Sequence, residues 1–116
     1  MFENRRSRRK SAQGRIEVSN VLTGESMGQL GNLSVDGMLL IANRSIPDDA
    51  LFQFAFELPG RDGAAGRRIE VGVHEQWSEP AQAPGQVWAG FRIIDLAPDA
   101  RAAVSAWVEM HDETDL

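Results

Sequence analysis

Short runs of strand-forming residues, separated by turn residues, are the feature that most constrains what this chain can fold into. Six runs follow one another, at residues 15–22, 27–35, 38–42, 51–58, 69–77 and 86–96. Glycine, proline and aspartate between them mark turns, and no long helical period appears before the last run ends. This spacing predicts a mainly β fold, a six-stranded antiparallel barrel, because closure hides the sheet edges.

The patterns within the runs predict which strand faces are buried. Phenylalanines at every second position of residues 51–58 indicate one apolar face. In residues 69–77 every second residue is expected on one face in the same way: Ile69, Val71, Val73, Glu75 and Trp77. Residues 38–42 are all apolar, so this strand is expected to be buried on both faces.

Residues 98–111 predict a C-terminal α-helix that covers one side of the barrel. Pro98 suits a first helical position, and Asp99 in the first turn interacts favourably with the helix dipole. Apolar residues and one histidine recur at the spacing of a single helix face: Ala100, Ala103, Val104, Trp107, Val108 and His111. We therefore divide the chain into a basic loop at 1–14, a barrel plus helix at 15–111 and an acidic tail at 112–116.

Length and composition narrow the class of protein. A chain of 116 residues is of the size of one domain. It contains no cysteine, which excludes disulfides, thiolate metal sites and thiol nucleophiles. The chain begins with charged residues and has no apolar run near the roughly 20 residues that cross a bilayer. We expect a cytoplasmic protein without a membrane partner.

Charge is distributed unevenly along the chain. The net charge is −5, yet the first fifteen residues contain five arginines and Lys10 against Glu3, so the remainder carries −10. A concentrated basic segment on an acidic body indicates a local anion site. A nucleic-acid-binding arm is the weaker alternative, because the run is short and contains no aromatic residue that could stack on bases.

No arrangement of residues predicts catalysis or a metal site. Residues 24–28 read Gly-Glu-Ser-Met-Gly, which matches a nucleophile elbow, but an elbow requires a strand-to-helix turn in a large α/β sheet. His74 and His111 have no second ligand at metal-binding spacing. We therefore expect neither an enzyme nor a bound cofactor.

Two separated motifs together resemble the PilZ family. Arg5 and Arg9 form an Arg-x-x-x-Arg motif, and Asn32, Ser34 and Gly37 form the Asn-x-Ser-x-x-Gly motif that follows it in that family. Asn32 replaces the more common aspartate, a change that the family tolerates. The resemblance covers nearly the whole chain and implies a six-stranded barrel with a C-terminal helix.

The resemblance also implies a ligand, cyclic di-GMP, which carries two phosphates and two guanines. Arg5 and Arg9 can bind a phosphate or the N7 and O6 atoms of guanine with two hydrogen bonds, and their planes can stack on a base. Asn32 offers a donor and an acceptor, and Ser34 offers a hydroxyl. Gly37 either adopts a positive φ or lets the ligand approach the backbone.

Further contacts are less defined. Arg6 and Arg8 are candidates for supporting phosphate contacts. Trp77 either stacks on a base or packs in the core, and Trp88 and Trp107 are expected to pack.

The predicted function is a cyclic di-GMP receptor or adaptor. Ligand binding would order the N-terminal arginine loop and change the surface shown to an unidentified downstream protein. The alternatives are a PilZ-like scaffold that binds proteins without the nucleotide and, less favoured, a nucleic-acid-binding domain.

Overall fold

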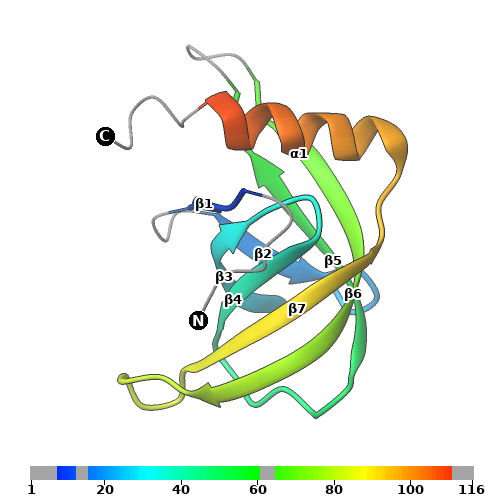
Figure 1. Ribbon diagram of the computed structural model, residues 1–116. Coiled ribbons are helices and arrows are strands. Elements are labelled where there is room, and N and C mark those ends of the chain that lie inside the picture. Colours follow the sequence, from blue (N-terminus) through cyan, green and yellow to red (C-terminus); the bar gives the residue numbers. More distant parts are fainter. Residues whose placement is uncertain (1–7, 13–15, 61–64, 111–116) are drawn as a thin grey trace.

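A computed structural model describes residues 8–12, 16–60 and 65–110. In these residues seven strands precede one helix: β1 Lys10–Ser11, β2 Glu17–Asn20, β3 Ser26–Leu33, β4 Gly37–Ala42, β5 Leu51–Leu58, β6 Arg67–Pro80, β7 Val87–Asp95 and α1 Pro98–Met110. The predicted mainly β fold with a C-terminal helix is confirmed (Figure 1).

Strands β2 to β7 form the barrel, and all their pairings are antiparallel. The order around it is β3-β2-β5-β6-β7-β4, and pairing of β3 with β4 closes the ring. Strand β1 lies outside the barrel, where it pairs with β3. The hairpin of β6 and β7 extends past the barrel at the end opposite α1 (Figure 1).

The barrel interior is apolar. The strand at β5 follows the predicted alternation, with Phe54, Phe56 and Leu58 buried. Phe54 packs against two further rings, with centroid distances of 5.1 Å to Phe52 and 5.3 Å to Phe91. The apolar core also includes the buried residues of α1, which are Ala100, Val104, Trp107 and Val108.

The structure corrects two expectations about the strands. The strand at 38–42 is not buried on both faces: Met38, Leu40 and Ala42 are buried, whereas Leu39 and Ile41 are half-buried. Leu39 lines a groove on the outer face of the barrel, so neighbouring side chains do not cover this face of the strand completely. The predicted loop at 1–14 is also not wholly a loop, because Lys10–Ser11 form β1 by pairing with β3.

The helix α1 has 13 residues and lies across one end of the barrel (Figure 1). Arg67 Nη2 lies 2.9 Å from Asp99 Oδ2, which links the start of β6 to the first turn of α1. Within the described ranges, no helix is both long and apolar enough to cross a membrane.

Candidate functional site

A groove of about 580 Å³ lies on the outer face of the barrel, over β4, β6 and β7 and beside β3. It is lined by polar, charged and aromatic side chains from segments far apart in sequence: Arg9, Asn32, Asp36, Gly37, Met38, Leu39, Gln76, Trp77, Glu79, Trp88, Gly90, Phe91 and Arg92. Four of the residues that the sequence singles out, Arg9, Asn32, Gly37 and Trp77, are in this set. Their role in binding stays a prediction.

The two halves of the predicted motif meet at one end of this groove. Arg9 Nη1 donates a hydrogen bond of 3.1 Å to Asn32 Oδ1. A Cβ atom on Gly37 would lie 3.1 Å from Arg9 Nη2 and 2.9 Å from the Phe91 carbonyl oxygen. Gly37 does not have a positive φ. The first of the two expected reasons is therefore wrong, and the absence of a side chain at Gly37 instead leaves room for Arg9. Close approach of the ligand to this backbone stays a prediction.

A β-bulge in β3 turns Asn32 toward the groove. Leu30 pairs with Leu40, whereas Asn32 pairs with Leu39, so the β3 register shifts by one residue between them. The extra residue lets both Leu30 and Leu33 stay in the core while Asn32 faces outward. Asn32 thus reaches Arg9 without loss of core packing.

Ser34 has a structural position that the sequence motif did not reveal. Its side chain is only 1% exposed and does not line the groove. The hydroxyl oxygen accepts hydrogen bonds of 3.1 Å from the backbone N–H groups of both Asp36 and Gly37, and the hydroxyl lies 3.3 Å from the Gly37 carbonyl, to which it donates. Ser34 therefore shapes the β3–β4 turn that carries Gly37.

Ser34→Ala is expected to lower the free energy of unfolding by about 1–3 kcal/mol, because it removes the partner of two backbone donors at a buried turn. Denaturant unfolding measures this change. Ser105→Ala, at an exposed position of α1, is the matched control and should change stability by less than about 0.5 kcal/mol. Equal stability of both variants would contradict the role of the Ser34 hydroxyl in the turn.

A second bulge, in β6, places Trp77 on the outer face. Glu75 pairs with Phe91 and Trp77 pairs with Gly90, so two steps along β6 match one step along β7. The expectation that residues 69–77 share one face is therefore wrong at its end: Glu75 is buried, and Trp77 is 47% exposed. The core alternative for Trp77 is excluded by this exposure.

The Trp77 ring lies directly on β7 where that strand has a glycine. A Cβ atom on Gly90 would collide with the indole. A flat aromatic surface thus lines the same groove as Arg9 and Gly37. Such a surface suits stacking of a planar ring system of a ligand.

The sequence patterns missed two groove residues on β7. Trp88 is 43% exposed, so its predicted packing role is wrong, and Arg92 is exposed directly opposite Gly37. Alternation could have revealed them, since Ala89 and Phe91 are buried and the residues between and beside them must face outward. Trp107 is 4% exposed and packs as expected.

The remaining predicted contacts do not enter the groove in the described part of the chain. Arg8 is exposed and does not line it. Arg5 and Arg6 lie outside the described residues. Within the groove the cations Arg9 and Arg92 are accompanied by the carboxylates of Asp36 and Glu79. The groove therefore has a charged end around Gly37, with arginine and aspartate side chains, and an aromatic part around Gly90.

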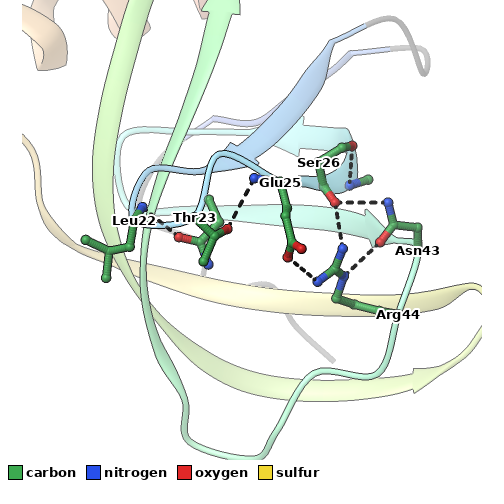
Figure 2. A network of polar contacts seen from close by, with 8 residues as sticks. Leu22, Thr23, Glu25, Ser26, Asn43 and Arg44 are labelled. Atoms are coloured by element: carbon green, nitrogen blue, oxygen red, sulfur yellow. Dashed lines mark hydrogen bonds and ion pairs between the residues drawn. The ribbon is translucent and has the colours of Figure 1, made fainter.

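The serine of the elbow-like sequence belongs to a structural network. Figure 2 shows Ser26 beside Asn43 and Arg44, whose side chains donate to its carbonyl oxygen at 3.2 and 3.0 Å. Arg44 also lies 3.1 Å from Glu25 Oε1. Ser26 begins β3, a strand between two hairpins, so the strand-to-helix turn of a nucleophile elbow is not formed.

His74 is a surface residue held by its neighbours. Its Nε2 lies 3.2 Å from Asp49 Oδ1, and its Nδ1 lies 3.1 Å from Gln76 Nε2. Over the residues that the structure describes, no group of three or more His, Asp or Glu side chains is arranged to hold a metal ion.

Comparison with solved structures identifies the architecture. The inhibitor of motility MotI/DgrA of Bacillus subtilis superposes with a TM-score of 0.79 at 12% identity, over 99% of this chain and 54% of that one. The PilZ domain of YcgR from Escherichia coli, solved with c-di-GMP, superposes with a TM-score of 0.61 at 14% identity, over 97% of this chain and 98% of that domain. This chain has a PilZ-like fold.

The structural likeness is not accompanied by a close sequence relative. No protein-family model and no curated protein sequence matches the chain. The chain spans about half (54%) of the Bacillus subtilis protein's length. The course of the backbone therefore establishes the PilZ-like fold, whereas it does not identify a ligand.

Proposed function

We propose that this PilZ-like domain is a cytoplasmic receptor for cyclic di-GMP that binds its ligand in the groove between Arg9 and Trp77. The observation that carries the proposal is the meeting of Arg9 with Asn32 and Gly37 in a groove that an exposed tryptophan ring also lines. Guanidinium groups bind phosphates and guanine edges, and indole rings stack on bases. One ligand class, a nucleotide with a planar base and an anionic backbone, satisfies both features.

The resemblance in sequence assigns a second arginine to the same ligand. Arg5 would add a guanidinium group four residues before Arg9, and Arg6 and Arg8 would contribute positive charge. The solved YcgR domain with a similar fold contains c-di-GMP, which supports this ligand class. Ligand held by the arginines would change the surface around β1 and β3, and a downstream protein would recognise that change.

Titration calorimetry with cyclic di-GMP tests the proposal. Cyclic di-AMP is the matched control, because guanine offers two acceptors, N7 and O6, to an arginine, whereas adenine has an N–H donor in place of O6. We expect saturable binding of cyclic di-GMP and about five- to a hundredfold weaker binding of cyclic di-AMP, since one bidentate contact gives about 1–3 kcal/mol of discrimination.

Two results would contradict the receptor. One is the absence of cyclic di-GMP binding. The other is equal binding of both dinucleotides with a steep loss of affinity in salt, which is the behaviour of a basic arm.

A scaffold without nucleotide is the second candidate, and one surface favours it. Leu22, Leu51 and Ile94 are 84%, 68% and 54% exposed and line a hollow of about 480 Å³ over β5, β6 and β7. Exposed aliphatic side chains gathered in this way are typical of protein contacts. The scaffold becomes the leading function if the calorimetric titration shows no dinucleotide binding.

A further inference from the structure

The only lysine of the chain lies where the arginine segment meets α1. The 12 cationic residues are eleven arginines and Lys10, and Lys10 directly follows Arg9. Lys10 is 7% exposed, although lysine is almost never buried without a partner. Its position within the fold therefore requires a specific interaction.

That interaction is with the end of α1. The Lys10 Nζ atom lies 3.9 Å from the centroid of the Trp107 ring and donates a hydrogen bond of 3.4 Å to the Trp107 carbonyl oxygen. The last four carbonyls of a helix have no partner within the helix, and α1 has no basic residue in its last turn. Lys10 thus supplies, from the other end of the sequence, the positive charge that stabilises a helix C-terminus.

Strand β1 connects this contact to the groove. Lys10 pairs with Leu33 and Ser11 pairs with Asn32, the residue that Arg9 contacts. Neighbouring residues of an extended segment point to opposite sides, so Arg9 faces the groove while Lys10 faces α1. Figure 1 shows β1 on the side of the barrel where α1 ends.

We propose that Lys10 is a positioning residue: its contact with Trp107 fixes the arginine segment on β3 and couples occupancy of the groove to the last turn of α1. The part that concerns the ligand rests on the proposed function, whereas the contact itself does not. Coupling of two sites is reciprocal. A ligand that orders Arg9 therefore also stabilises the contact of Lys10 with Trp107, and loss of that contact lowers the affinity for the ligand.

The first test needs no ligand and no variant at Lys10. With a single lysine in the chain, an N-hydroxysuccinimide acetate reagent and peptide mass spectrometry report the reactivity of this one side chain. We expect Lys10 to be acetylated much more slowly in the folded wild type than in the same protein unfolded in urea, and to become faster in folded Trp107→Leu. Fast acetylation of Lys10 in the wild type would overturn the proposal.

The second test measures the effect on the groove. Lys10→Met removes the charge and keeps an unbranched stem, Lys10→Arg keeps the charge, and Arg101→Met removes an exposed charge from α1 as the matched control. Titration with cyclic di-GMP should show about tenfold weaker binding for Lys10→Met, within the usual range of coupling between sites, and less than about twofold change for the other two.

Hydrogen exchange separates positioning from general stability. The Ala12 amide bonds to the Gly31 carbonyl at 3.0 Å, and it should lose protection in Lys10→Met, while the amides of β5 keep theirs. Unchanged Ala12 protection together with unchanged affinity would refute the inference and leave the receptor intact. Wild-type protein that does not bind the dinucleotide would refute the receptor, and exchange and acetylation would still decide the role of Lys10.

Discussion

Arg9→Ala is expected to lower the affinity for cyclic di-GMP by at least about a hundredfold while the melting temperature stays nearly constant. A charged hydrogen bond contributes about 1.5–3 kcal/mol, and a bidentate contact contains two of them. Stability should change little, because the side chain is exposed and its bond to Asn32 is a surface interaction. Calorimetric titration and thermal unfolding of the same samples measure both quantities.

Arg9→Lys tests whether the planar group or only the charge is needed. Lysine cannot form the paired hydrogen bonds of a guanidinium, so a defined site predicts a loss close to that of alanine. Arg101→Ala, at an exposed position on α1 outside the groove, is the control for loss of charge and should bind normally. Normal affinity in Arg9→Lys, with binding that merely fades as salt is raised, would show a nonspecific basic segment.

Phe54→Ala is expected to lower the free energy of unfolding by about 3–5 kcal/mol, the usual cost of truncating a buried phenylalanine. Phe54 has no exposed surface and packs against the rings of Phe52 and Phe91. The cavity would lie inside the barrel, which has few ways to collapse around it. Denaturant unfolding measures the change.

Leu51→Ala is the control for Phe54, since Leu51 is on the same strand and 68% exposed. It should change stability by less than about 0.5 kcal/mol. A loss for Phe54→Ala that is no larger than that of Leu51→Ala would mean that β5 does not turn its phenylalanines toward the core.

The fold could be predicted because alternation of apolar and polar residues indicates which face of each strand is buried. At β5 the phenylalanines occupy every second position, and the structure buries Phe54 and Phe56 in the barrel. Such period-two patterns persist until a bulge shifts the register. The bulge before Trp77 is produced by tertiary pairing of β6 with β7, and no local residue signals it.

The site could be predicted in part. The sequence motif joined Arg9 to Asn32 and Gly37, and the structure brings these three residues together. Trp88 was assigned to packing because tryptophan is a large apolar residue, although alternation along β7 places it on the opposite face from Ala89. The contact of Lys10 with Trp107 could not be predicted either, because it joins residues 97 positions apart.

The ligand contact of Ser34 stays a prediction, and the structure shows why a motif alone is ambiguous. A serine that binds ligand and a serine that holds a turn occupy the same place in the pattern. Here the hydroxyl is engaged by the backbone of Asp36 and Gly37 and is buried. Any effect of Ser34 on binding is expected to act through Gly37.

The most direct test of the groove is a titration of ¹⁵N-labelled protein with cyclic di-GMP, followed at the three indole N–H signals. The chain has three tryptophans, two of which, Trp77 and Trp88, line the groove, while Trp107 belongs to α1 and is buried in the core. The proposed site predicts large, saturable shifts of the Trp77 and Trp88 signals and a smaller shift of Trp107. Binding that leaves Trp77 and Trp88 unmoved would place the ligand elsewhere and contradict the account.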